Sequence, residues 1–357
     1  MTLEPNPATL NLIRKGLKPS SPYLTRSGAG SVCQVRNALA AERNIVKLGR
    51  IFSSIKLVLA LGLGSTSLCS AQEVSFGYVE WPGVTVKTHV ASAILDTLGY
   101  ETDMQALSVP LVFKGLSEGD LDAFLGVWEP SMESMVNPYL SDEGGDGTVT
   151  LVARNLEPTI YRPAVPTFVS EQGISSLADV AANADMFGGQ VYGIEPGNDG
   201  NQILIDMIEA DTYGFSSLEL VESSTEGMLT QVERAVEREE PIAFLAWSPH
   251  WMNAAFDLTY LDDPENVWGG DGYVATAMNS DTLQADANLA KFLEQYTVTP
   301  EMQDLWIDAY SRQGNDPAQV AREWITANLD TVTGWVDGVT TADGGSAAEA
   351  LEAEFGN

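Results

Sequence analysis

Short apolar runs alternate with amphipathic stretches along residues 73–127, in the order strand, helix, strand, helix, strand. The first helical stretch places Val86, Val90 and Ile94 on one stripe, which is the spacing of an amphipathic helix. Strand–helix–strand units of this length predict a parallel sheet with right-handed crossovers. The expected strands lie at 73–80, 101–107 and 122–127, and the expected helices at 85–98 and 109–117.

A second alternation follows, beyond a polar, glycine-rich loop at 141–147. It opens on extended segments at 149–153 and 159–169. Pro158, Pro163 and Pro166 should break these segments, because proline cannot donate to a strand ladder. The elements expected next are helices at 176–182, 202–211 and 226–239 and buried strands at 190–194 and 242–246.

After residue 246 the pattern predicts only helices, around 286–294, 300–310 and 317–328, with an acidic helical tail from 347. A first α/β unit that is resumed after a second one predicts an α/β fold of two lobes, joined by two hinge crossings, with the ligand in the cleft between them. We assign residues 72–157 and 246–357 to lobe 1 and residues 158–245 to lobe 2.

The first 71 residues have the character of a leader. Residues 1–56 hold nine of the 18 Lys and Arg residues and only two acids. The short apolar run 57–64 and the small residues up to Ala71 follow, which is the pattern of a secretory signal peptide, and the apolar run is too short to span a membrane. We expect export to the periplasm, with cleavage near Ala71.

Charge and cysteine content narrow the function of the remaining chain. It carries 48 acids against nine bases, which disfavours nucleic acid and anionic membrane surfaces as partners. Both cysteines, Cys33 and Cys69, lie in the leader, so no disulfide, thiolate nucleophile or cysteine metal site remains. His89 and His250 lie on separate segments, and no nucleophile–base motif is present. We expect neither an enzyme nor a cofactor or metal.

Large aromatic residues end three of the predicted strands. Trp81, Trp128 and Trp247 are each followed by proline within two residues, and Tyr161 lies in the first crossing. A single Trp of this kind is more simply a core residue, but the arrangement recurs. Parallel strands bring their carboxyl ends to one edge of a sheet, so the rings should converge there. Electron-rich rings around one point can enclose a methylated ammonium group by cation–π attraction.

The chain resembles the choline- and glycine-betaine-binding proteins of ABC importers across residues 73–345, and is closest to the choline-binding branch. The segments that carry the resemblance are Trp81-Pro-Gly, Leu125-Gly-Val-Trp-Glu-Pro130, Tyr161-Arg-Pro-Ala-Val-Pro166, Tyr192-Gly-Ile-Glu-Pro-Gly-Asn-Asp-Gly-Asn201, Val221-Glu-Ser-Ser224, Gly227-Met-Leu-Thr-Gln-Val-Glu-Arg234, Leu245-Ala-Trp-Ser-Pro-His250 and Gly338-Val-Thr-Thr-Ala-Asp-Gly-Gly345. It implies a two-lobed, type II-like periplasmic-binding-protein fold. It also implies a monomer that passes a small methylated amine to a permease and an ATPase subunit.

The resemblance also implies roles for individual residues. Trp81, Trp128, Tyr161 and Trp247 would form the aromatic box, and Asn198 would meet the polar end of the ligand. Because helix N-termini offer free N–H groups, Gly197, Asn198 and Asp199 are expected to receive a carboxylate or an N-oxide oxygen as well. Trp251 and Trp268 lie near the same predicted edge and are further candidates.

One position departs from the pattern of the family. The choline binders carry Asp two residues after the first Trp, where this chain has Gly83. Glu80 and Glu129 flank the Trp residues instead, either as ligand contacts or as solvated rim carboxylates. The departure leaves glycine betaine, choline and trimethylamine N-oxide open as ligands, and favours one that carries an anionic oxygen. A ligand-sensing module of a receptor is the alternative from another functional class.

Overall fold

The computed structural model describes residues 72–356, and the predicted leader and signal peptide lie outside the described residues. The first sheet contains β1 (Glu73–Tyr78), β2 (Glu101–Ala106) and β3 (Ala123–Glu129), with β1 parallel to both neighbours. The crossovers are α1 (Pro82–Thr97) and α2 (Val109–Glu118), close to their predicted ranges. Helix α1 begins earlier than expected because Pro82, whose φ suits a helix, occupies its first turn.

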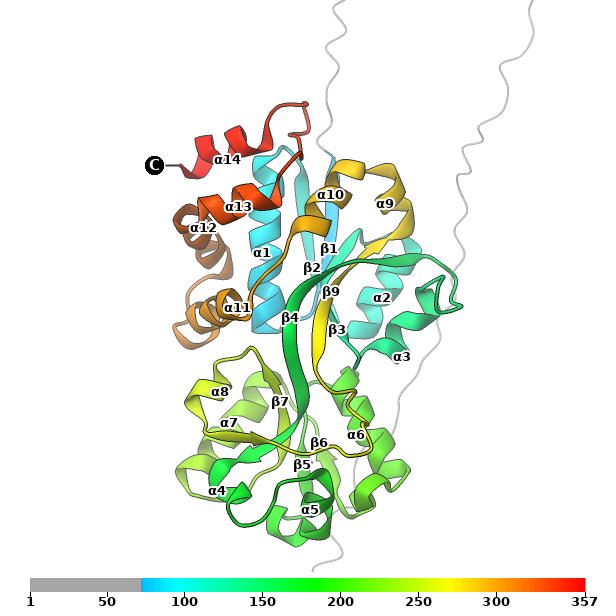
Figure 1. Cartoon of the computed structure of the whole chain (residues 1–357), viewed down its shortest axis with the longest axis vertical. Helices are drawn as coiled ribbons and strands as arrows, with labels where there is room; N and C mark the ends of the chain where they lie inside the picture. The colour runs from blue at the N-terminus through cyan, green and yellow to red at the C-terminus, as the bar shows by residue number, and fades with distance from the viewer. Residues whose placement is uncertain (1–71, 357) are drawn as a thin grey trace, which may run out of the picture. The chain divides into compact units, whose positions relative to one another are not determined.

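Two long strands connect this sheet to the rest of the molecule (Figure 1). Strand β4 (Val149–Pro166) pairs with β9 (Gly272–Asn279), which lies antiparallel between β3 and β4. The predicted breaks in β4 at Pro158 and Pro163 are wrong, and the one at Pro166 is confirmed. Its pairing shifts from β9 to β7 around Pro158, where the ladder is already irregular, and Pro166 is its last residue.

The second sheet contains β5 (Gln190–Tyr192), β6 (Glu219–Val221) and β7 (Phe244–Ser248), with β8 (Leu258–Tyr260) paired to the end of β4. Strand β7 is antiparallel to β4 and parallel to β5. The helices of this part are α4 (Thr167–Ser170), α5 (Leu177–Ala182), α6 (Asp199–Glu209), α7 (Thr225–Glu237), α8 (Met252–Ala255) and the 3₁₀ segments Ala184–Phe187 and Thr212–Ser217.

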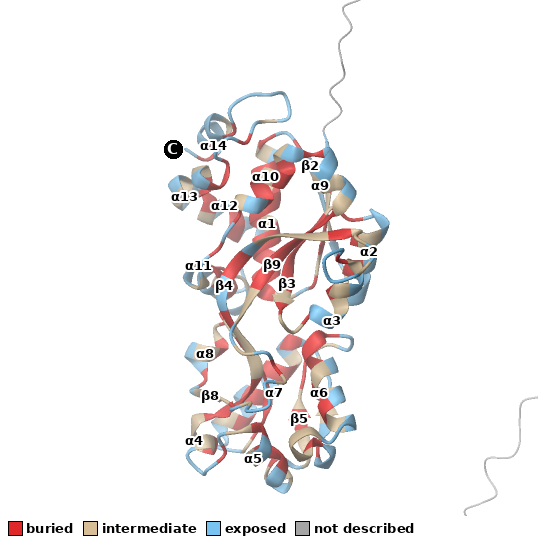
Figure 2. Ribbon diagram, turned by 45° about the vertical axis from the view of Figure 1, so that its right-hand side comes forward, coloured by how far each residue is buried: buried red, intermediate tan, exposed pale blue. Residues whose placement is uncertain are grey.

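The apolar side chains gather into two cores, which Figure 2 shows in red on either side of the crossing strands. The core of lobe 1 contains buried residues from 74–149 and 275–355, and that of lobe 2 contains buried residues from 164–268. The expected return to lobe 1 at residue 246 is therefore too early. Met252, Phe256 and Leu261 pack into lobe 2, and the chain returns through β9.

The remaining helices complete lobe 1. They are α3 (Glu133–Val136), the 3₁₀ turn Asn137–Tyr139, α9 (Ser280–Ala285), α10 (Ala287–Gln295), α11 (Pro300–Ile307), the π segment Asp308–Arg312, α12 (Pro317–Ala327), α13 (Leu329–Trp335) and α14 (Ala347–Phe355). Helix α1 packs against α11 and α12, so these late helices close its outer side. Within residues 72–356, none of the helices combines the length and the apolar character that crossing a bilayer requires. The fold is a two-lobed α/β fold.

Candidate ligand-binding site

Two aromatic rings of the pocket come from lobe 1. Trp81 immediately precedes α1, at the end of the chain segment that leaves β1. Trp128 is the penultimate residue of β3. Both side chains are half-buried and line a pocket between the lobes.

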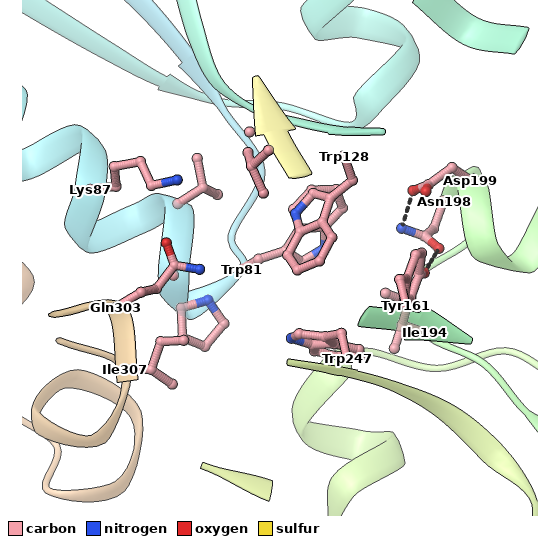
Figure 3. Close-up of a pocket in the computed structure, with 15 residues that line it drawn as sticks. Trp81, Lys87, Trp128, Tyr161, Ile194, Asn198, Asp199, Trp247, Gln303 and Ile307 are labelled. Carbon is pink, nitrogen blue, oxygen red and sulfur yellow. Dashed lines mark hydrogen bonds between the residues drawn. The ribbon is translucent and has the colours of Figure 1, made fainter. Parts of the chain in front are cut away.

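The other two rings come from lobe 2. Tyr161 on β4 and Trp247 on β7 are direct cross-strand partners, and their ring centroids lie 6.1 Å apart. The Tyr161 ring also lies 5.8 Å from that of Trp128, across the lobes. The rings therefore meet because two lobes face each other, and not along one edge of a single sheet as predicted (Figure 3).

Hydrogen bonds orient two of these rings. The indole Nε1 of Trp81 donates to Oε1 of Glu195 in lobe 2 at 2.7 Å. The Tyr161 hydroxyl donates to Oδ1 of Asn198 at 2.9 Å. Position 200 has to be glycine, because a Cβ there would overlap the Tyr161 hydroxyl. Burial holds the pKa of the Tyr161 phenol well above its usual range, so this hydroxyl remains a donor.

The start of α6 lines the pocket with an amide and a carboxylate. Oδ1 of Asn198 accepts from the N–H groups of Gly200 and Asn201, at 2.8 and 3.3 Å, and the N–H of Asn198 itself donates to the carbonyl of Glu195 at 3.2 Å. Nδ2 of Asn198 donates to Oδ1 of Asp199 at 3.0 Å. Gly197 is exposed and lies outside the pocket lining.

Asp199 is the buried anion of the lobe 2 wall. Its side chain is 2% exposed, and its Oδ2 has no hydrogen-bond partner among the described residues. Burial raises the pKa of this carboxyl to about 6. The helix start thus presents a carboxylate to the pocket, and this carboxylate would repel a ligand carboxylate.

Two polar residues that sequence reasoning missed line the lobe 1 wall, namely Lys87 on α1 and Gln303 on α11. Lys87 shares one helix face with the buried residues Val84 and Ala91. A lysine within an apolar stripe is the sequence feature that could have indicated a buried functional residue. Burial lowers the pKa of Lys87 to about 7. Gln303 comes from a distant helix and carries no comparable signal.

Two predicted acidic contacts lie outside the pocket lining. Glu80 is exposed to solvent. Glu129 is buried, but successive strand residues face opposite sides, so it turns away from Trp128 toward Glu133 and Glu143. Burial raises the pKa of Glu129 to about 7, and the neighbouring acids Glu133, Asp199 and Glu143 add to this shift.

Trp251 and Trp268 also lie outside the lining, in supporting positions. Trp251 donates its Nε1 to Oγ of Ser311 in lobe 1 at 2.9 Å, so it joins the lobes instead of facing the pocket. The Trp268 ring packs edge-on against Tyr161, with the centroids 5.7 Å apart.

Two α/β lobes with a pocket lined from both sides define a two-lobed solute-binding protein. The chain belongs to the family described as the substrate binding domain of ABC-type glycine betaine transport systems, whose model matches residues 72–327. Proteins of this family bind the substrate of a transporter outside the cytoplasm and are not enzymes. The resemblance seen in the sequence motifs is confirmed.

The chain is also similar to individual relatives. The chain is similar to the solved structure of an ABC-transporter choline binding protein in complex with choline, at 39% identity and a TM-score of 0.76, covering 80% of this chain and 98% of that one. It is 42% identical over 137 residues to the uncharacterized protein ORF1 of Chromohalobacter salexigens, covering 38% of this chain and 84% of that protein. It is 34% identical over 127 residues to the glycine betaine/carnitine transport binding protein GbuC of Listeria monocytogenes, covering 35% of this chain and 42% of that protein.

Proposed function

We propose that this protein captures a methylated-amine osmolyte in a box formed by Trp81, Trp128, Tyr161 and Trp247, closes around it and delivers it to a permease and an ATPase subunit. Glycine betaine and choline are the leading candidates, in keeping with the family and with the ligands named for its relatives. The protein acts in the periplasm as a monomer, after removal of its signal peptide.

The observation that carries this proposal is the set of four aromatic side chains lining one pocket, two from each lobe. A methylated ammonium is weakly hydrated and has no N–H, so aromatic faces attract it better than hydrogen-bonding groups do. Each well-placed ring contributes about 0.5–2 kcal/mol. Four such rings together contribute about 2–8 kcal/mol, and the upper end of that range approaches micromolar binding without an ion pair.

Closure of the lobes around the ligand is the second part of the proposal. Two side-chain hydrogen bonds that join the lobes support it, Trp81 to Glu195 and Trp251 to Ser311. A ligand that contacts both lobes favours the closed arrangement. Small-angle scattering should show a smaller radius of gyration at saturating ligand, and an unchanged profile alongside measured binding would contradict closure.

Trimethylamine N-oxide is the second candidate ligand. Gly83 provides no carboxylate to accept from a choline hydroxyl, whereas Lys87 and Gln303 line the same wall with donors for an oxide. On this wall the acceptor left to a choline hydroxyl is the neutral Oε1 of Gln303, and a hydrogen bond to a neutral group contributes about 0.5–1.5 kcal/mol against about 1.5–3 kcal/mol for one to a charged group. An anionic oxygen on the ligand would therefore give tighter binding than choline.

Calorimetric titration with glycine betaine, choline, trimethylamine N-oxide and proline, side by side, tests this function. We expect both oxygen-anion methylated amines to bind more tightly than choline. Proline should bind weakest, because its ammonium group carries no methyl groups. Choline as the tightest ligand would contradict the selectivity, and binding of none of the methylated amines would contradict the function.

A further inference from the structure

Lys87 places a buried amine, which carries a positive charge below its lowered pKa of about 7, in the pocket proposed to enclose a methylated ammonium. Its side chain is 1% exposed and lines the pocket, and Figure 3 shows it extending from α1 toward the other lining residues. The ammonium donates to Oδ1 of Asn155 at 2.6 Å and, at the long distance of 3.4 Å, to the carbonyl of Leu125. An ammonium has three N–H donors, so at least one is available to a ligand.

Lys87 has no carboxylate partner among residues 72–356. Burying a charge without a counter-charge is costly, and buried lysines are rarely left unpaired. The positive charge would also repel a ligand that is only a cation. Both costs fall if the bound ligand brings a negative group to this wall.

Gln303 provides a second polar group beside Lys87. It is 3% exposed, lines the pocket, and has a buried Oε1 without a hydrogen-bond partner. Figure 3 shows its Nε2 on the side that faces Trp81. A Cβ at Gly83 would lie 2.8 Å from Nε2, so Gln303 fills the space next to that glycine.

We propose that Lys87 and Gln303 form a subsite for an anionic oxygen of the ligand, so that zwitterionic methylated amines bind with their oxygen end toward lobe 1 and their methylated ammonium near Asp199. The inference rests on the proposed function and adds the orientation of the ligand within the same pocket. It reverses the orientation expected from the sequence, in which the start of α6 receives the oxygen end. The cap at Asn198 and the carboxylate of Asp199 make that helix start a poor anion site.

The alternative role for Lys87 is structural, because its bonds to Leu125 and Asn155 tie α1 to β3 and β4. A structural role and a ligand role differ in their dependence on the ligand. Loss of a structural tie affects every ligand alike, whereas loss of an anion subsite affects only ligands that carry an anion. Glycine betaine and tetramethylammonium form a matched pair, since both carry a methylated ammonium and only the first has a carboxylate.

The test measures the affinity of both ligands by calorimetry in the wild-type protein and in Lys87→Met. The wild-type protein should bind glycine betaine at least tenfold more tightly than tetramethylammonium. In Lys87→Met the affinity for glycine betaine should fall by about 10- to 100-fold, the range for a hydrogen bond to a charged group. Tetramethylammonium should bind unchanged or more tightly. Lys114→Met removes an exposed lysine on α2 and should change neither affinity.

Folding of Lys87→Met is supported by Asn155, which keeps its bonds to Leu125 and Thr276. Gln303→Leu is the second variant and should reduce the preference for glycine betaine by several-fold. Equal losses for both ligands, or no loss for glycine betaine, would overturn the inference while leaving the proposed function intact. Failure of the wild-type protein to bind either ligand would overturn both.

Discussion

The two walls of the pocket carry the same kind of ring and opposite kinds of polar group. Lobe 1 provides Trp81 and Trp128 together with the buried ammonium of Lys87. Lobe 2 provides Tyr161 and Trp247 together with the buried carboxylate of Asp199.

Because of this difference, the affinity for the ligand and the orientation of the ligand depend on different groups. Aromatic rings on both walls attract a methylated ammonium but do not determine which way the remainder of the ligand points. A cation on one wall and an anion on the other favour one direction for a zwitterion, because each charge then meets its opposite. We therefore expect the rings to supply most of the binding energy and the polar groups to set the orientation of the ligand.

The largest effect should come from the rings. Trp128→Ala and Trp247→Ala should each weaken glycine betaine and tetramethylammonium binding by about 1–3 kcal/mol, because both ligands lose the same aromatic contact. Trp324→Ala is the control, since this Trp packs against Trp306 and Trp335 away from the pocket. It should lower the melting temperature and leave affinity unchanged. Normal binding by both pocket variants would show that the box is assigned wrongly.

Asp199→Asn should have the next largest effect, about a tenfold loss for both ligands, because it removes the anion that faces the ammonium. Lys87→Met affects only the zwitterion, so the two variants distinguish the walls. If Asp199→Asn spared tetramethylammonium, the carboxylate would not lie near the cation.

The pH dependence of binding tests the role of Asp199 on the lobe 2 wall. With a pKa of about 6 in the free protein, Asp199 is protonated below that pH, and a cation must then displace the proton. Wild-type affinity for tetramethylammonium should fall as the pH is lowered from about 7 to 5. Glu195, Glu129 and Lys87 are also near the pocket and titrate as well, so the wild-type pH dependence alone does not identify Asp199. The test compares the slope of affinity against pH in the two proteins, and this slope should be shallower in Asp199→Asn.

Gly83→Asp tests the space beside Gln303. The single variant should bind poorly, because its Cβ would meet Nε2 of Gln303 at 2.8 Å. Gly83→Asp with Gln303→Ala removes that contact and places a carboxylate on the lobe 1 wall. The double variant should shift the preference from glycine betaine toward choline by up to about tenfold, since the hydroxyl gains an acceptor. Titration of both ligands measures the shift, and an unchanged ratio would exclude this wall as the determinant of selectivity.

The smallest effect concerns Glu129, which adds negative charge behind the pocket. Its pKa of about 7 lies above the usual value, so its contribution to stability is favourable at low pH and is lost as the pH rises through 7. Glu129→Gln should raise the melting temperature by a few degrees at about pH 8 and by less at about pH 5. Thermal unfolding of the wild-type protein and the variant at both pH values measures this change in melting temperature. An equal change at the two pH values would indicate an effect on packing and not on charge.

The sequence predicts the lobes and the rings better than the polarity of the pocket. Apolar periodicity and proline after a buried strand identify Trp128 and Trp247, because these signals are local. Strand β9 escapes prediction because its small residues, such as Ala275 and Ala277, carry little strand propensity, and their burial depends on β3 and β4.

The polar wall of lobe 1 could not be derived from local patterns. Gln303 meets Gly83 through the packing of α11 on α1, a contact between segments far apart in the chain. The role of Asn198 depends on the fold for a related reason. The sequence places it at the start of α6, but its hydrogen bonds to the helix start and to Tyr161 of another segment are set by packing.

The crystal structure of the complex with glycine betaine tests the orientation most directly. We expect a carboxylate oxygen within hydrogen-bonding distance of Nζ of Lys87, and the trimethylammonium group among the four rings on the side of Asp199. A carboxylate bound at the start of α6, with the ammonium toward Lys87, would contradict the assignment of the two walls.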